Sequence, residues 1–283
     1  MNRKALALYG LKWNPFASDQ PVDARWRSPK LDHFCWRVEQ MATEGGFAAI
    51  LGQPGTGKSV ALQILASHLS SLSDVVVGAL THPQCGVGDF YREIGHIFGV
   101  PLSASNRWGG FKSLRDRWKA HIDSTLYRPI LLIDEAQLLP GDVFSELRLL
   151  SSTDFDSKAI LTVVLCGDDR LVERFRTPEL LPLGSRIRTR LIMEHSTPQE
   201  LAEFLRHCVD KAGNASLLTP DLIDALATHS MGNFRALMTM AGELLAVGVK
   251  QEARQLDEKL YFDVYAAPRK ADASRNQQKG KNR

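Results

Sequence analysis

The sequence predicts a three-layer α/β domain with a parallel sheet, followed by a small all-helical domain. Between residues 46 and 196, short apolar runs alternate with helical patterns, and this alternation is typical of parallel sheets with helices on both faces. From 197 to 266 only helical patterns follow. We expect residues 1–45 to form an N-terminal segment with a first helix, and residues 267–283 to form a disordered tail.

Five apolar runs are the candidate strands of the α/β domain. The second and third do not alternate with polar residues, which indicates strands buried on both faces. The five runs span residues 46–51, 74–80, 128–136, 158–167 and 189–195. Apolar residues at helical spacing separate them, and these predicted helices cover 89–98, 111–122 and 143–150.

The helical domain shows the usual signals for helix ends. Residues 196–213 open with Ser and Thr, continue with Pro and acidic residues, and close on Gly213. Residues 219–232 repeat this order and close on Gly232, and two further helical patterns follow. The absence of another apolar run of strand type predicts a domain made of helices alone.

The composition is that of an ordinary soluble protein, with 44% hydrophobic and 24% charged residues among 283. No apolar run reaches the roughly 18–20 residues needed to cross a bilayer, and the N-terminus lacks a secretory signal. We therefore expect a cytoplasmic protein with no membrane partner. The four dispersed cysteines are expected to be reduced thiols rather than zinc ligands.

The predicted tail is strongly basic. Residues 268–283 hold six basic side chains and one acid, a net charge of +5, so residues 1–267 carry −2. Such a segment either solubilises the protein or forms an arm that contacts DNA or a partner protein. The sequence leaves both roles open.

Residues 52–59, GQPGTGKS, complete the GxxxxGK[ST] pattern between an apolar run and an amphipathic helix. Glycines in this pattern let backbone N–H groups surround a phosphate at the helix N-terminus, and the lysine and hydroxyl contact the β/γ-phosphates and Mg²⁺. We therefore expect a P-loop that binds ATP with Mg²⁺. The residues expected to hold ATP in this loop are Gly52, Gln53, Pro54, Gly55, Thr56, Gly57, Lys58, Ser59 and Val60.

An acidic pair lies within the third run, directly after its apolar residues 130–133. Asp134 is expected to bind Mg²⁺ together with Ser59, and Glu135 to polarise the water that attacks the γ-phosphate. Lys58 is expected to assist catalysis by contacting the transferred phosphate. A carboxylate at position 135 favours an ATPase over a scaffold that only binds nucleotide.

Three further groups are candidates for contact with the γ-phosphate. Asp168 ends the fourth apolar run and either senses this phosphate or opens a helix from a turn. One of Arg186, Arg188 and Arg190 is expected to be an arginine finger from a neighbouring subunit, with Arg186 favoured over a solvated basic edge. Arg235 falls in the first turn of a helix, where its charge opposes the helix dipole, so it either meets a phosphate or pairs with an acid.

With these pieces in place, the chain resembles an AAA+ ATPase of the ExeA/TniB type, a branch that includes transposon target-selection ATPases such as TnsC. Four segments carry the resemblance, which extends over most of the chain: YGLKWNPF, GGFAAILGQPGTGKS, LLIDEAQLL and GNFRAL. The resemblance implies the Walker A role of residues 52–59, the Walker B roles of Asp134 and Glu135, and a sensor 2 role for Arg235. Asp168 departs from the Asn or Thr common at sensor 1.

The resemblance also implies that residues 13–16, including Asn14, Pro15 and Phe16, line the adenine pocket. A flat aromatic ring and a rigid proline suit a purine face, but the same residues also suit a hydrophobic anchor in the core. Both roles remain possible for this segment.

We expect an ATP-dependent regulator of DNA transposition. Its subunits would form a ring or filament on double-stranded DNA with ATP at their interfaces, recruit a transposase, alone or with a targeting protein, and disassemble on hydrolysis. The alternative is an ExeA-like ATPase that assembles a secretion complex. Candidate DNA contacts surround Trp108 on a helix whose Phe111, Leu114 and Trp118 also fit a plain amphipathic helix. The basic residues are Arg107, Lys112, Arg115, Arg117 and Lys119.

Overall fold

The computed structural model describes residues 3–100, 107–125, 128–154 and 157–265. The chain divides into two compact units. The α/β unit spans Arg27–His195, and the helical unit combines the segment up to Trp26 with the chain from Ser196 onward. The predicted N-terminal segment 1–45 is thus divided between the two units at Arg27, and the predicted tail lies outside the described residues.

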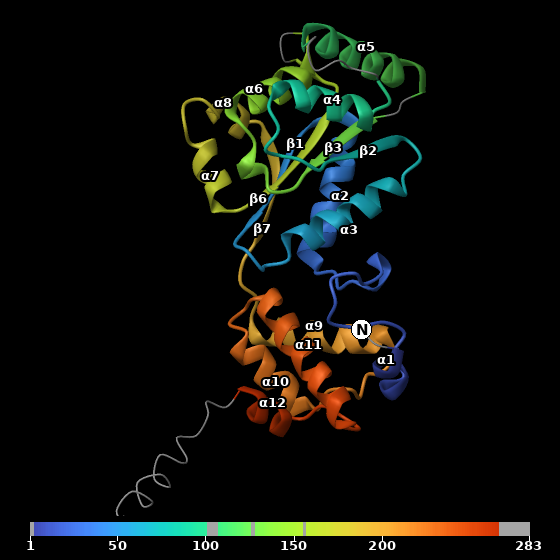
Figure 1. The fold of residues 1–283 in the computed structure, drawn as a ribbon. Helices are drawn as coiled ribbons and strands as arrows, with labels where there is room; N and C mark the ends of the chain where they lie inside the picture. Colours follow the sequence, from blue (N-terminus) through green and yellow to red (C-terminus); the bar gives the residue numbers. More distant parts are fainter. Residues whose placement is uncertain (1–2, 101–106, 126–127, 155–156, 266–283) are drawn as a thin grey trace, which may run out of the picture. The chain divides into compact units, whose positions relative to one another are not determined.

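The α/β unit contains a five-stranded parallel sheet with the order β2-β3-β6-β1-β7 (Figure 1). The strands are β1 (Gly46–Gly52), β2 (Val75–Leu80), β3 (Arg128–Ile133), β6 (Thr162–Gly167) and β7 (Ile187–Met193). The three central strands are almost entirely buried, as expected for apolar runs without alternation. Because neighbouring strands are parallel, their carboxyl ends meet at the same edge of the sheet.

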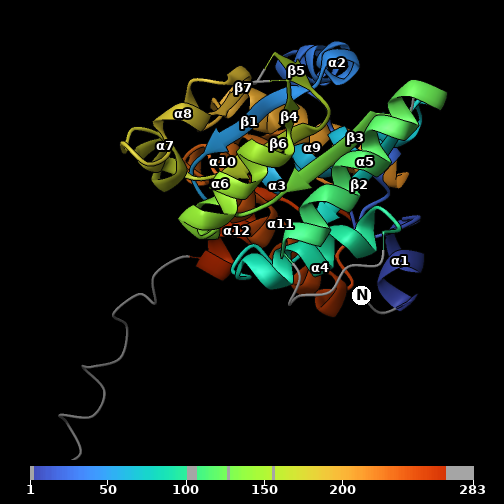
Figure 2. The same cartoon turned by 90° about the horizontal axis from the view of Figure 1, so that it is seen from above.

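Helices cover both faces of this sheet. Phe47, Ala49 and Leu51 of β1 pack into one large cluster with residues of the helices after β2, β3 and β6, while Ala48 and Ile50 face the other side. Those helices are α4 (Val87–Ile97), α5 (Arg107–Thr125), α6 (Gly141–Leu150), α7 (Asp169–Phe175) and α8 (Leu181–Gly184). The opposite face is covered by α2 (Pro29–Glu44) and α3 (Lys58–Ser70). Figures 1 and 2 both show α4 beside α5 and α6.

Two of the predicted strands differ from the structure. The run 74–80 was expected to be buried, but β2 is an edge strand and several of its side chains are partly or fully exposed. The run 158–167 splits, because β5 (Lys158–Ala159) pairs antiparallel with β4 (Ser152–Thr153) and β6 begins only at Thr162. Strand order across the sheet decided the first outcome, and a short antiparallel pairing with residues 152–153 decided the second.

The helical unit contains α1 (Arg3–Tyr9), a short 3₁₀ turn η1 (Val22–Ala24), α9 (Pro198–Ala212), α10 (Pro220–His229), α11 (Phe234–Gln251) and α12 (Glu258–Tyr265). Thr197 and Glu200 form a capping box that starts α9, and Gly213 ends it in the left-handed conformation. Tyr9, Leu11 and Phe16 join the buried core of the C-terminal helices. The three-layer α/β domain followed by helices is therefore confirmed.

Candidate nucleotide-binding site

The glycine-rich loop lies between β1 and α3, at the carboxyl edge of the sheet. Gly55 and Gly57 have φ of 86° and 95°, a region that L-residues with a side chain rarely adopt. Gly57 is the N-cap of α3 and supplies no side-chain cap, so the first amides of this helix are suited to an anion. The predicted phosphate loop has the local geometry that such a site requires.

Lys58 is fixed inside this loop. Its side chain is 7% exposed, and its Nζ donates a hydrogen bond of 3.0 Å to the main-chain oxygen of Gln53. The buried hydroxyl of Thr56 donates to the same oxygen at 2.8 Å. An ammonium has three donors, so Lys58 keeps donors for a phosphate while this contact limits where it can move.

The acidic pair lies at the same edge of the sheet. β3 neighbours β6 and β6 neighbours β1, so Asp134, which follows β3, lies near the loop that follows β1. The buried thiol of Cys166 lies among these groups: burial raises its pKa well above the ordinary value, a hydrogen bond with Asp134 raises it further, and the charge of Lys58 opposes this. The structure thus brings Lys58 and Asp134 to the same place.

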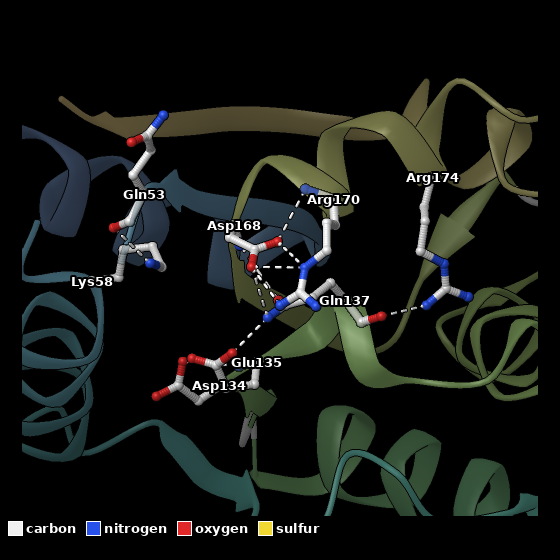
Figure 3. Close-up of polar contacts among 8 residues, drawn as sticks. All are labelled: Gln53, Lys58, Asp134, Glu135, Gln137, Asp168, Arg170 and Arg174. Carbon is white, nitrogen blue, oxygen red and sulfur yellow. Dashed lines mark hydrogen bonds and ion pairs between the residues drawn. The ribbon is translucent and has the colours of Figure 1, made fainter. Parts of the chain in front are cut away.

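Glu135 is held in an unusual backbone conformation beside Asp134. Its φ and ψ are 50° and 39°, in the left-handed region, and its N–H donates to Asp134 Oδ1 at 2.9 Å. Its carboxylate accepts a hydrogen bond of 2.5 Å from Gln137 Nε2 (Figure 3). Two contacts therefore orient the residue predicted to activate water.

Gln137 is the residue of this site that sequence reasoning missed. It is 7% exposed in the turn η2 (Ala136–Leu138), and its amide also donates to Asp168 Oδ2 and accepts from Asp168 N, both at 3.4 Å. Arg174 donates to its main-chain oxygen at 2.8 Å, which steadies the turn (Figure 3). The sequence feature that could have indicated its role is a polar amide between the apolar residues Ala136 and Leu138.

Asp168 is the N-cap of α7, as the alternative role at a helix start requires. Its side chain caps the helix through Arg170 N at 3.0 Å and pairs with the Arg170 guanidinium at 2.6 Å (Figure 3). The hydrogen bond from Arg170 holds the pKa of the Asp168 carboxyl below its ordinary value, with a smaller contribution from the charge of Lys58. Asp168 is thus a charged helix cap, linked through Gln137 to Glu135.

Arg186 and Arg188 lie at the opposite end of β7 from the loop, and Arg190 lies near the middle of the strand, opposite Ala49. Gly52 pairs with Met193, and Phe47 pairs with Ile187. The start of β7 is therefore separated from the loop by about six residues, or about 20 Å. Arg188 pairs with Glu44 at 2.8 Å, and Arg190 donates to the oxygen of Gly184 at 3.2 Å. Arg186 is half-buried just before β7.

Two groups of predicted nucleotide contacts, Arg235 and the segment 14–16, belong to the helical unit. Arg235 is exposed in the first turn of α11, and in the described part of its unit no carboxylate pairs with it. Asn14 Oδ1 accepts from Phe16 N at 3.0 Å, Pro15 O accepts from Gln20, and Phe16 is buried in the core. Phe16 therefore serves as the hydrophobic anchor, and its contact with adenine stays a prediction.

The candidate DNA contacts lie on α5, whose Leu114 and Trp118 are buried and whose Phe111 packs beside them. This confirms the predicted amphipathic helix. The basic residues differ in exposure: Lys112 and Arg117 are exposed, Lys119 is half-buried, and Arg115 donates to Leu149 O at 2.9 Å. Arg107 starts α5, and its side chain lies outside the described residues. Trp108 is 73% exposed and stacks on Phe111.

The chemistry of the site fits Mg²⁺. Ser59 is exposed in the first turn of α3, and Asp134 supplies a carboxylate at the neighbouring strand end. A hydroxyl and a carboxylate are oxygen ligands of the kind that Mg²⁺ prefers when phosphate oxygens and water complete its shell. The described residues contain no group of three or more His, Cys, Asp or Glu side chains that would form a separate metal site.

A family model described as AAA domain matches residues 41–175, which include the loop, the acidic pair and Asp168. Residues 41–175 form an AAA-type P-loop ATPase domain. ATPases of this type bind ATP with Mg²⁺ and hydrolyse it, so the predicted activity and cofactors agree with the family of this domain.

The chain is also similar to a named protein. General secretion pathway protein A of Aeromonas hydrophila is 31% identical over 193 residues, which cover 66% of this chain and 34% of that protein. The chain thus corresponds to about a third of that relative.

Solved structures share the fold. The Cdc6p structure from Pyrobaculum aerophilum has a TM-score of 0.67 at 15% identity, covering 86% of this chain and 67% of that one. Drosophila ORC, solved bound to DNA, has a TM-score of 0.68 at 15% identity, covering 94% and 66%. Among the described residues, no helix has the length and apolar character needed to span a bilayer.

Proposed function

We propose that this AAA-type ATPase is a switch whose subunits assemble in a ring or filament with ATP held between neighbours. The distance of about 20 Å along β7 between its first residue, next to the favoured Arg186, and the loop of the same chain carries this proposal. An arginine at that end contributes to catalysis only at the loop of another subunit. Binding energy at each such interface would make assembly depend on ATP by mass action.

Each residue has a proposed role at this interface. The loop amides and Lys58 hold the phosphates, Ser59 and Asp134 hold Mg²⁺, and bound Mg²⁺ supplies charge neutralisation for phosphoryl transfer. Glu135, oriented by Gln137, accepts the proton of the attacking water. Arg186 of a neighbour and Arg235 of the helical unit stabilise charge on the γ-phosphate.

We further propose that the assembly forms on double-stranded DNA and regulates transposition. On DNA it would recruit or activate a transposase, and hydrolysis would dismantle it. The exposed charges of Lys112 and Arg117 on α5 and the basic composition of residues 268–283 support contact with DNA phosphates. The Drosophila relative in fold is also bound to DNA.

A second candidate function is the assembly of a secretion complex. The 31% identity to General secretion pathway protein A favours it, although this chain covers only 34% of that protein. Both candidates need ATP-dependent assembly, and they differ in whether DNA is the platform.

Electron microscopy and light scattering with a non-hydrolysable ATP analogue, with and without duplex DNA, test the proposal. We expect the analogue to produce rings or filaments, and duplex DNA to increase them and to raise the ATPase rate. Monomers under every condition would contradict assembly at ATP interfaces. Assemblies that duplex DNA leaves unchanged would contradict the transposition proposal and favour the secretion candidate.

The DNA contact has a matched pair of variants. Lys112→Ala removes an exposed charge on α5, and Lys30→Ala removes an exposed charge on α2. We expect only Lys112→Ala to weaken DNA binding and to reduce its salt dependence, by about one counterion. Equal effects of the two variants would remove α5 from the DNA surface.

A further inference from the structure

The main-chain oxygen of Gln53 holds together residues of the phosphate loop. Its carbonyl oxygen accepts hydrogen bonds from Thr56 N at 3.4 Å, Thr56 Oγ1 at 2.8 Å and Lys58 Nζ at 3.0 Å. Figure 3 shows the Lys58 ammonium directed to this carbonyl. The position of the Gln53 peptide therefore sets the position of the ammonium that meets a phosphate.

The side chain of Gln53 makes two contacts outside the loop. Its Nε2 donates to Asp169 Oδ2 at 3.3 Å, and its Oε1 lies 3.3 Å from His195 Nε2. Because Oε1 only accepts, the His195 ring donates from Nε2. Asp169 is the first residue of α7, and His195 is the last residue of the α/β unit before the helical unit begins.

We propose that Gln53 is a positioning residue that couples nucleotide binding to the junction at His195. Its carbonyl fixes Lys58, and its amide ties the same residue to α7 and to the end of the α/β unit. The inference rests on the proposed binding of ATP by this loop. It goes beyond that binding, because it assigns to Gln53 the transmission of the effect of bound phosphate to His195.

The geometry favours a contact that nucleotide can alter. A phosphate that attracts the Lys58 ammonium changes the hydrogen bond between Lys58 Nζ and the Gln53 carbonyl. Any shift of this peptide moves the side-chain amide as well. Both side-chain bonds are 3.3 Å long, beyond the usual range of about 2.7–3.2 Å, so a small shift changes them substantially. The junction at His195 then responds to the state of the loop.

Five variants and one control test this coupling. Gln53→Ala removes both side-chain bonds and leaves the carbonyl that holds Lys58. Gln53→Glu places a carboxylate against Asp169, and adding Asp169→Asn restores a hydrogen bond with the donor reversed. His195→Gln keeps a donor at the junction, whereas His195→Phe removes it. Gln40→Ala, on an exposed part of α2, is the matched control.

Two measurements are made on the full chain: the Kd of a fluorescent ATP analogue, and hydrogen exchange of residues 190–200 with and without saturating analogue. We expect Gln53→Ala and Gln53→Glu to weaken binding about threefold to tenfold and to lose most of the nucleotide-induced change in exchange. The double variant should recover that change, and His195→Gln should retain it. His195→Phe should lose the change, and the control Gln40→Ala should retain it.

The outcomes distinguish a failure of the proposed ATP binding from a failure of the coupling role of Gln53. Failure of the unaltered protein to bind the analogue would contradict the proposed function. If the unaltered protein binds and Gln53→Ala shows the same exchange change at saturation, the coupling role of Gln53 is overturned. Weakened binding in Gln53→Glu that Asp169→Asn fails to rescue would also overturn it, because a mere loss of folding would not depend on the direction of one hydrogen bond.

Discussion

At the scale of single residues, Glu135 combines backbone strain with a proposed catalytic role. A non-glycine residue in the left-handed region costs about 1–2 kcal/mol. Here that conformation places its N–H on Asp134 and its carboxylate on Gln137. The local cost is offset by a side chain that is oriented before any substrate arrives.

Replacing Glu135 with Gln tests this role. Glu135→Gln keeps the size of the side chain and removes the proton acceptor, so we expect ATP turnover to fall by about 100-fold or more. ATP binding should persist and assemblies should accumulate, because disassembly needs hydrolysis. Steady-state phosphate release and analogue affinity measure the two effects.

The control is Glu173→Gln, on the exposed side of α7. Its turnover should equal that of the unaltered protein. A turnover in Glu135→Gln that also stays normal would remove Glu135 from the mechanism.

The pair of Asp168 and Arg170 predicts a pH-dependent stability. Because the folded-state pKa of Asp168 is lowered, its contribution is present above the unfolded pKa of about 3.9 and is lost as pH falls through the folded pKa. We expect Arg170→Ala to be less stable than the unaltered protein at pH 7 in urea unfolding. The difference should shrink toward zero as the pH falls below about 3.9.

A second substitution separates the cap from the ion pair. Asp168→Ser keeps a side-chain cap for α7 and loses the partner of Arg170. It should show the same loss of pH dependence as Arg170→Ala. A stability difference that stays constant from pH 7 to pH 3 would contradict the ionic contribution.

At the scale of secondary-structure elements, the sequence predicted local patterns well and pairings poorly. The apolar runs 46–51 and 128–133 became buried strands, because a fully apolar run is stable only inside a covered sheet. The strand order and the exposure of the edge strand β2 depend on partners distant in the chain, and the split of the run 158–167 depends on pairing with residues 152–153 outside the run. Local periodicity carries no information about such partners.

The same limit applies to the site. The phosphate loop and the acidic pair were predictable, because their chemistry needs residues adjacent in the sequence. The bridge from Gln137 to Asp168 joins residues 31 positions apart, and only the neighbouring positions of β3 and β6 bring them together. The tie between Gln53 and His195, 142 positions apart, depends in the same way on the pairing of β1 with β7.

That pairing predicts the effect of a small substitution. A Cβ at Gly52 would overlap the main-chain oxygen of Met193 in the neighbouring strand and approach Thr56 Oγ1 to 3.0 Å. We expect Gly52→Ala to destabilise the α/β unit by about 1–3 kcal/mol and to weaken ATP binding, because backbone cannot move aside as a side chain does. Urea unfolding and analogue titration measure both.

Gly141→Ala is the matched control for Gly52→Ala. The three atoms nearest to a Cβ at Gly141 all belong to the end of the exposed, flexible Glu179 side chain. Its effect on stability should be less than about 0.5 kcal/mol. Equal losses in the two variants would show that the strand pairing does not set the cost.

At the scale of the whole molecule, a composite active site predicts complementation between two inactive variants. Lys58→Ala removes the phosphate contact of one chain, and Arg186→Ala removes the finger that a chain offers to its neighbour. In a random mixture, about a quarter of interfaces would combine an intact loop with an intact arginine, since each interface joins two independently chosen chains. We expect about a quarter of normal ATP turnover in a 1:1 mixture.

Parallel mixtures with Arg188→Ala and Arg190→Ala identify the finger. A variant that keeps full activity alone is not the finger, and only the finger variant should gain activity on mixing with Lys58→Ala. If no mixture gains activity, catalysis does not require an arginine from a second chain.

The buried thiol of Cys166 also has a practical consequence. Burial and the neighbouring Asp134 keep it protonated at neutral pH, and alkylating reagents consume thiolates. The rate at which iodoacetamide modifies Cys166 therefore measures how often this edge of the sheet opens to solvent. A bound ligand that closes this edge would slow the alkylation of Cys166. The thiol thus serves as a built-in reporter of local opening in this domain.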